Sequence, residues 1–116
     1  MELQHRVVAI VPCNDLDESQ AFYERLGFTA AAVYPHQGYR ILQDARGASL
    51  HLTTAPPGWV VPERNAHGLY FYAEEVEALA EAFGCKAELK PWGLREFAVT
   101  DPDGVLVRVG WAAPRP

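Results

Sequence analysis

Aromatic rings and histidines are the side chains in this sequence whose types suit ligand chemistry. An aromatic ring can stack on a planar ligand, and each offset-stacked pair contributes about 0.5–1.5 kcal/mol beyond the area that it buries. Because aromatic residues are also common in cores and subunit interfaces, structural packing is the alternative interpretation. The rings spread over the expected strands and connections are Tyr34, His36, Tyr39, His51, Trp59, Tyr70, Tyr72, Trp92 and Phe97.

Groups that could catalyse a reaction without a metal are not evident in the sequence. Neither Cys13 nor Cys85 has a recognisable base beside it, and both are expected to be reduced thiols that pack as small hydrophobic residues. The sequence contains no nucleophile elbow and no glycine-rich phosphate loop. Asp101 and Asp103 belong to an Asp-Pro-Asp-Gly sequence, which is typical of a turn between strands and not of an acid–base pair.

These side chains must be positioned by two similar series of helices and strands, one in each half of the sequence. In the first half, Asp15 is suited to cap a helix that Gly27 ends. In the second half, a helix begins at Glu74 or Glu75 and ends at Gly84. Short runs rich in β-branched and aromatic residues, separated by turn signals, predict the strands. The expected strands cover residues 7–11, 28–34, 39–43 and 49–53 in the first half, and 69–72, 87–89, 95–100 and 105–111 in the second.

The two halves resemble each other when the sequence is shifted against itself by about 57 residues, as expected for an internal duplication. We therefore predict an α+β fold of two βαβββ modules, at about residues 1–54 and 67–112. A proline-rich connection joins the modules within a single domain that spans residues 1–116. The shift pairs Gly27 with Gly84, Gly47 with Gly104, and His51 with Arg108.

Alternation along the last strand of each half separates two faces. Leu50 and Val107 fall on a face that is suited to packing beneath a helix. His51 and Arg108 fall at equivalent places on the opposite face of the two strands. A face that carries histidine and arginine is better suited to lining a cleft than to forming a core.

The composition excludes several classes of protein. The chain has 116 residues, a formal net charge of -5 and no basic run that could bind nucleic acid phosphates. No apolar segment approaches the roughly 18 residues of a membrane span, and no secretion signal is evident, so we expect a cytoplasmic protein without membrane or nucleic acid partners. A domain of this size has a thin core, which makes a homodimer an expectation. Acidic residues that could steer a cationic ligand are Glu63, Glu74, Glu75, Glu88 and Glu96.

Several motifs resemble the vicinal oxygen chelate superfamily, which includes glyoxalase I, extradiol dioxygenases, and the fosfomycin and bleomycin resistance proteins. The resemblance is carried by NDLDESQAFYERLGF at residues 14–28, ILQ at 41–43 and DPDGVLVRV at 101–109. The nearest likeness is to bleomycin resistance proteins, through AFYERLGF, an aromatic residue after Gly38, Trp92 followed by glycine, and DPDG nine residues after Trp92. The resemblance implies the same fold of two βαβββ modules.

Enzymes of this superfamily hold a divalent metal through His, Glu or Gln residues on the first and last strands of each half. The resemblance places these positions at Val8, His51, Arg108 and either His67 or Gly68. Val8 offers no donor, and Arg108 is a permanent cation without a lone pair. We therefore expect neither a metal nor another cofactor. The alternative is a metal site made of His5, His51 and His67.

The resemblance also implies how a ligand would bind. Bleomycin-type proteins hold flat heteroaromatic groups between aromatic rings, in grooves where two subunits meet. By this likeness Trp92 is the leading stacking residue, Tyr39 is the next, and Trp59 is a candidate lid over the cleft. The expected ligand-binding residues are Trp92, Tyr39, Tyr34, His51, Trp59, Tyr70 and Arg108.

Three hypotheses about function follow from the motifs. The first is a non-catalytic resistance protein that sequesters a planar, cationic small molecule such as a glycopeptide antibiotic. The second is a metal-dependent glyoxalase-like lyase or isomerase, or a thiol transferase, of the same superfamily. The third is a binding module for an unrelated metabolite. Because the usual set of metal ligands is incomplete, we expect a binding protein and not an enzyme.

Overall fold

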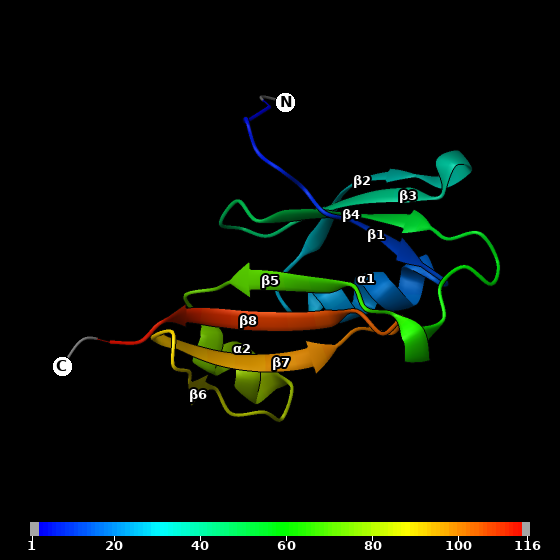
Figure 1. Ribbon diagram of the computed structural model, residues 1–116. Coiled ribbons are helices and arrows are strands. Elements are labelled where there is room, and N and C mark those ends of the chain that lie inside the picture. The colour runs from blue at the N-terminus through cyan, green and yellow to red at the C-terminus, as the bar shows by residue number, and fades with distance from the viewer. Residues whose placement is uncertain (1–2, 115–116) are drawn as a thin grey trace. The chain divides into compact units, whose positions relative to one another are not determined.

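The computed structural model describes residues 3–114, which form two compact units. The N-terminal unit ends at Val60, and the C-terminal unit begins at Val61. Each unit contains one α-helix and one four-stranded sheet (Figure 1), so the predicted α+β fold of two βαβββ modules is confirmed. None of the helices among these residues is long and apolar enough to span a membrane.

The N-terminal unit is a sheet with the strand order β1-β4-β3-β2. β1 runs parallel to β4, whereas β4 with β3 and β3 with β2 are antiparallel pairs. α1 packs against β2 and β4. The elements are β1 (Ile10–Cys13), α1 (Leu16–Glu24), β2 (Thr29–Tyr34), the 3-10 helix η1 (Pro35–Gln37), β3 (Tyr39–Gln43) and β4 (Ser49–Thr54).

The first strand begins later than the sequence pattern predicts. Val7 is 98% exposed and lies outside β1, which instead includes Pro12 and Cys13. Pro12 fits because β1 lies at the edge of the sheet, next to β4. Backbone N–H groups from β4 and the residue after it donate to Ala9 and Cys13, so the missing N–H of the intervening Pro12 falls outside the ladder.

Capping by Asp15 explains where α1 begins. Its carboxylate accepts hydrogen bonds from the backbone N–H groups of Asp17 at 2.9 Å and Glu18 at 3.2 Å. Gly27 has a φ of 98°, which allows the chain to leave the helix in the left-handed conformation. The predicted start and end of this helix are confirmed.

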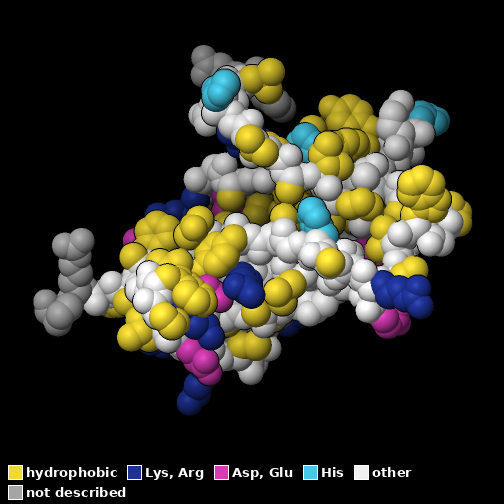
Figure 2. Space-filling model, viewed as in Figure 1, with side chains coloured by type: hydrophobic (Ala, Val, Ile, Leu, Met, Phe, Trp, Pro, Cys, Tyr) yellow, Lys and Arg dark blue, Asp and Glu magenta, His cyan; other side chains and the backbone are white. Residues whose placement is uncertain are grey.

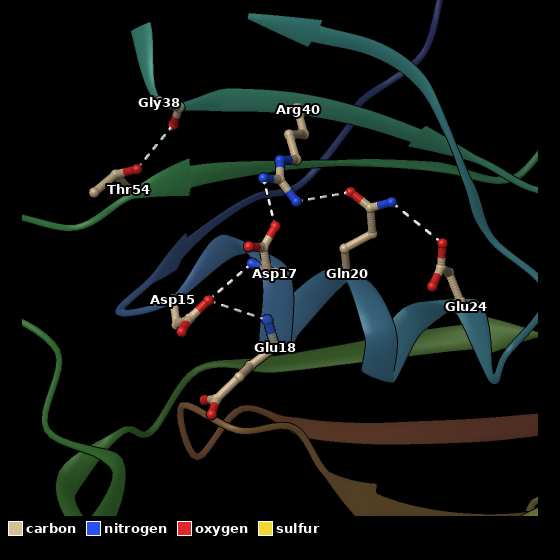
Figure 3. A network of polar contacts seen from close by, with 8 residues as sticks. All are labelled: Asp15, Asp17, Glu18, Gln20, Glu24, Gly38, Arg40 and Thr54. Atoms are coloured by element: carbon tan, nitrogen blue, oxygen red, sulfur yellow. Dashed lines mark hydrogen bonds and ion pairs between the residues drawn. The ribbon is translucent and has the colours of Figure 1, made fainter. Parts of the chain in front are cut away.

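Arg40 connects β3 to α1 on the helix side of the N-terminal sheet (Figure 3). Its guanidinium donates to Oδ1 of Asp17 at 2.7 Å and to Oε1 of Gln20 at 2.9 Å. The amide group of Gln20 in turn donates to Glu24 at 3.2 Å. These bonds hold the start of β3 against the helix, and Tyr39, the residue before Arg40, faces the opposite side of the sheet.

The C-terminal unit repeats this plan with the strand order β5-β8-β7-β6. β5 runs parallel to β8, and the pairs β8 with β7 and β7 with β6 are antiparallel. α2 packs against β7 and β8 and lies behind the sheet in Figure 1. The elements are the 3-10 helix η2 (Pro62–Arg64), β5 (Gly68–Tyr72), α2 (Val76–Ala82), β6 (Glu88–Leu89), β7 (Leu94–Thr100) and β8 (Leu106–Ala112).

The Asp-Pro-Asp-Gly sequence forms the turn between β7 and β8. Oδ1 of Asp101 accepts hydrogen bonds from the backbone N–H groups of Asp103 at 2.8 Å and Val105 at 2.9 Å. Asp101 and Asp103 are both buried. The interpretation of this sequence as turn chemistry is therefore confirmed.

The internal repeat does not have one constant shift. Ile10 of β1 pairs with His51 of β4, and Tyr70 of β5 pairs with Arg108 of β8. The last strands therefore correspond at a shift of 57 residues, whereas the first strands correspond at a shift of 60. A shorter helix contributes to this difference, because α1 has nine residues and α2 has seven.

The predicted separation of faces is confirmed in both units. Leu50 of β4 and Val107 of β8 are buried on the side of their helix. His51 is half-buried and Arg108 is exposed on the opposite side. We call the side of each sheet that is turned away from its helix the open face. The open face of the C-terminal sheet is turned toward the viewer in Figure 1.

Candidate functional site

A buried carboxylate lies at the centre of the open face of the C-terminal sheet. Glu96 is only 4% exposed. A carboxylate is rarely buried unless other groups pair with it. Its Oε1 atom accepts a hydrogen bond from the Tyr70 hydroxyl at 2.8 Å and another from Nε1 of Trp92 at 3.2 Å. No residue among 3–114 is hydrogen-bonded to the second oxygen, Oε2. We call Glu96, Tyr70, Trp92 and Tyr72 the Glu96 cluster.

The strand register brings Tyr70 to Glu96 across an intervening strand. Tyr70 is on β5, Glu96 is on β7, and Gly110 of β8 lies between them as the partner of Glu96. A Cβ atom on Gly110 would overlap the Tyr70 hydroxyl. The absence of a side chain at Gly110 therefore allows the phenol ring to lie across β8 and reach the carboxylate.

Tyr72 and Trp92 of the Glu96 cluster offer exposed aromatic surface for a ligand. The rings of Tyr70 and Tyr72 are 4.7 Å apart between centroids, with an interplanar angle of 40°. Tyr72 is 64% exposed and Trp92 is 56% exposed. Figure 2 shows hydrophobic side chains gathered over this part of the C-terminal sheet, with acidic and basic groups among them. Exposed rings beside a carboxylate can stack on a planar group and attract a cation at the same time.

Tyr70 acts as a neutral hydrogen-bond donor to Glu96. Burial and, after it, the hydrogen bond and negative charge of Glu96 raise the pKa of Tyr70 from 10.0 to about 12. Burial disfavours the phenolate because it removes water from the charged form, and Glu96 disfavours it because a second negative charge would form beside an existing one. The hydroxyl therefore remains protonated throughout the physiological pH range.

Arg108 lies beside the Glu96 cluster on the same open face. Its direct neighbours across the sheet are Tyr70 on β5 and Ala98 on β7. The side chain is exposed, and it forms no hydrogen bond or ion pair with any residue between positions 3 and 114. By contrast, Arg95 on the other side of the strand donates to Glu77 at 2.7 Å.

The open face of the N-terminal sheet carries a second group of predicted residues. The Tyr39 hydroxyl and Nδ1 of His51 are 2.7 Å apart and form a hydrogen bond. Tyr34 is the cross-strand partner of Tyr39 and is 47% exposed. Trp59 lies after β4, outside the sheet, and is 80% exposed.

The structure thus divides the predicted ligand-binding residues between the units. Tyr70, Trp92 and Arg108 lie together on the C-terminal sheet. From the sequence, Glu96 was predicted only as one of several acidic residues that could steer a cationic ligand, and Tyr72 was not predicted to bind the ligand. Alternation within 95–100 places Glu96 on the opposite face from the apolar Phe97, which was the signal available in the sequence.

Comparisons with known proteins identify the family. The sequence model of the Glyoxalase/Bleomycin resistance protein/Dioxygenase superfamily matches residues 3–109. The chain belongs to this superfamily. A bleomycin resistance protein from Klebsiella pneumoniae is 33% identical in an alignment of 116 positions that covers 85% of this chain and 86% of that protein. The resemblance inferred from the motifs is confirmed.

Solved structures of antibiotic-binding proteins share the superfamily fold. A bleomycin-binding protein complexed with bleomycin is 23% identical, with a TM-score of 0.79, over 95% of this chain and 100% of that chain. A bleomycin resistance determinant encoded on the transposon Tn5 is also 23% identical, with a TM-score of 0.80, over 96% and 100%. An antibiotic-binding protein from Streptomyces sp. CB03234 is 22% identical, with a TM-score of 0.76, over 97% and 99%. At these identities the likeness establishes the fold.

The residues at the superfamily's metal positions do not fit a divalent metal. Because Ile10 and Tyr70 correspond in the two sheets, Val8 corresponds to Gly68 and not to His67. Val8 and Gly68 have no donor side chain, and a guanidinium such as that of Arg108 cannot ligate a cation. Residues 3–114 contain no group of three or more His, Cys, Asp or Glu side chains that could hold a metal ion.

Proposed function

We propose that this protein is a non-catalytic, antibiotic-binding resistance protein of the bleomycin resistance type. It sequesters a planar, cationic small molecule, such as a glycopeptide antibiotic, and makes or breaks no bond in it. The observation that carries this proposal is the buried Glu96 carboxylate, which is held by Tyr70 and Trp92 beneath exposed aromatic surface. The relationship to a bleomycin resistance protein supports the same ligand class.

The charge and geometry of Glu96 favour a cationic ligand. A cation that approaches this partly desolvated carboxylate is attracted more strongly than it would be by a carboxylate in water. Only Oε1 is occupied by Tyr70 and Trp92, which leaves Oε2 as an acceptor for a ligand N–H group. Charge-assisted hydrogen bonds of this kind are roughly twice as strong as neutral ones.

The aromatic residues supply the recognition of a planar group. Trp92 is the leading stacking residue, because more than half of its surface is exposed while its indole N–H is fixed by Glu96. A fixed ring loses less conformational entropy when a ligand stacks on it. We further propose that the ligand contacts Tyr34, Tyr39, His51, Trp59, Tyr70 and Arg108.

We also propose that the protein works as a cytoplasmic homodimer. Each unit has one helix on one four-stranded sheet, so each has little surface with which to enclose a ligand. In the proposed dimer the ligand grooves lie where two subunits meet. The second subunit would also bury part of the apolar surface that a domain of this size leaves in contact with water.

Calorimetric titration with bleomycin, with and without Zn²⁺, tests the proposed function. We expect micromolar or tighter binding that does not require the metal. Trp92→Ala should weaken binding by about tenfold or more, because it removes both the stacking surface and a hydrogen bond to Glu96. Trp92→Phe retains a ring and should lose less affinity than Trp92→Ala. Clear Zn²⁺ uptake without any drug binding would contradict the proposal and favour a metal-dependent enzyme.

A further inference from the structure

We propose that the ligand of the Glu96 cluster is amphoteric: it carries an anionic group as well as its planar cationic part, and Arg108 binds the anionic group. This inference rests on the proposed function and narrows its ligand class. The Glu96 cluster offers contacts for a cation and a flat ring, and an anionic ligand group would add a contact with the neighbouring Arg108.

Arg108 has no partner of its own among residues 3–114. The arginines on two other strands form ion pairs: Arg40 of β3 with Asp17 at 2.7 Å, and Arg95 of β7 with Glu77 at 2.7 Å. Arg108 forms no such pair with any residue described by the structure. Its guanidinium is always charged and presents a planar fork of N–H donors that matches a carboxylate or a phosphate.

The strand register places Arg108 close to Glu96 on the open face. Arg108 is directly beside Tyr70, and Glu96 is the partner of Gly110, two residues further along β8. Arg108 and Glu96 are therefore diagonal neighbours on one face, with backbones about 7–8 Å apart. The two opposite charges lie within side-chain reach of each other but form no ion pair, while Tyr70 and Trp92 occupy one oxygen of Glu96.

The arrangement of Glu96, Tyr70 and Arg108 matches one kind of small molecule. Tyr70 lies next to both charges, so a ring stacked on the cluster spans the space between the carboxylate and the guanidinium. A ligand with a cationic group near one edge of a flat ring system and an acidic group near another edge would satisfy both. A simple planar cation would satisfy Glu96 and would be repelled by Arg108.

A pair of fluorescent probes separates these two ligand types. 9-Aminoacridine is a planar cation, and its 2-carboxylate derivative is the same ring with an added acidic group. Fluorescence titration of the full chain should give about tenfold tighter binding of the carboxylate, the size expected for one charge-assisted contact. Arg108→Gln should abolish this preference, because the carboxylate of the derivative loses its partner.

Lys86→Gln is the matched control, because it removes one positive charge from the helix side of the same unit. It should leave the preference for the carboxylate unchanged. Equal binding of the two probes to the native chain, or an unchanged preference in Arg108→Gln, would overturn the inference. If Arg108→Gln instead alters the sedimentation coefficient and not the probe preference, a second copy of the chain is the partner of Arg108 and the inference also fails.

Bleomycin distinguishes failure of this inference from failure of the proposed function. If bleomycin binds but neither probe shows the expected preference, the amphoteric ligand class is wrong and the proposed function stands. If bleomycin and both acridines fail to bind, both proposals are overturned. Circular dichroism of each variant verifies that the exposed substitutions leave the fold intact.

Discussion

Glu96 links the local packing of the C-terminal sheet to its proposed chemistry. Placing a carboxylate where it is only 4% exposed costs solvation free energy, and hydrogen bonds from Tyr70 and Trp92 offset part of that cost. The same two bonds fix the aromatic rings on which a ligand would stack. One residue therefore both orders the site and provides its negative charge.

Gly110 is predicted to be required for this arrangement. In Gly110→Ala, the new methyl group would displace the Tyr70 ring and break its hydrogen bond with Glu96. The pKa of Tyr70 should then fall from about 12 toward 10.0. NMR titration of the tyrosine Cζ resonances, with Tyr70→Phe to assign the signal, measures this change.

Gly68→Ala provides the control for that substitution. Gly68 lies on the same face of β5, and a methyl group there would meet only the Leu106 carbonyl oxygen at 3.5 Å, an ordinary contact. The pKa of Tyr70 should be unchanged in this variant. An unchanged Tyr70 pKa in Gly110→Ala as well would show that the ring does not need the space above Gly110.

The raised pKa of Tyr70 also predicts how stability changes at alkaline pH. The folded state holds the phenol proton more tightly than the unfolded state, in which the pKa is near 10. The contribution is fully present below pH 10 and is lost as the pH rises through the folded-state pKa of about 12. Urea unfolding at a series of alkaline pH values should show a loss of stability in this window that is smaller in Tyr70→Phe. An equal loss in both proteins would contradict the assignment.

At the scale of elements, capping and turn residues predicted where most helices and strands begin and end. These predictions failed where burial or the number of residues in an element decided the boundary. Asp15 and Gly27 delimit α1 because capping and left-handed turns depend on the residue itself. The start of β1 was misplaced because Val7 is apolar yet fully exposed. The three-residue difference between the halves was missed because a single shift cannot represent helices of unequal length.

The candidate site was predictable only in part for a related reason. Alternation placed Arg108 on the open face, and the motifs singled out Trp92. The hydrogen bonds that join Tyr70 and Trp92 to Glu96 depend on the register of β5, β8 and β7, which the sequence does not specify. The pairing of Tyr39 with His51 depends in the same way on the register of β3 and β4.

The cap of α1 provides a test at this scale. Asp15→Ala should lower the free energy of unfolding by about 1 kcal/mol, since two backbone N–H groups lose their acceptor. Asp15→Asn retains an acceptor oxygen and should lose much less. Urea denaturation of the full chain compares the two. Equal losses would show that the charge of Asp15, and not its hydrogen bonding, stabilises the helix.

At the scale of the whole molecule, the proposal requires two copies of the chain. Sedimentation equilibrium should give twice the monomer mass of 12.9 kDa at micromolar protein concentration. Dilution should produce monomer and reduce bleomycin binding in parallel, because the grooves are proposed to need both subunits. A monomer that binds bleomycin with unchanged affinity would contradict the dimeric site while leaving the ligand class intact.

The net charge of -5 favours a cationic ligand less specifically than one buried carboxylate does. A general acidic field speeds the approach of a cation, and salt screens it. Direct contact with Glu96 would instead appear in the affinity at a fixed salt concentration. Removing single acidic groups from different places therefore separates the two effects.

The most direct measurement is a calorimetric titration of bleomycin into the native chain, Glu96→Gln and Glu81→Gln at one salt concentration. Glu81 is an exposed residue on α2, so its substitution removes the same charge away from the open face. We predict that Glu96→Gln weakens binding by about tenfold or more while Glu81→Gln has little effect. Equal affinities of Glu96→Gln and Glu81→Gln would contradict the claim that the Glu96 cluster binds the drug.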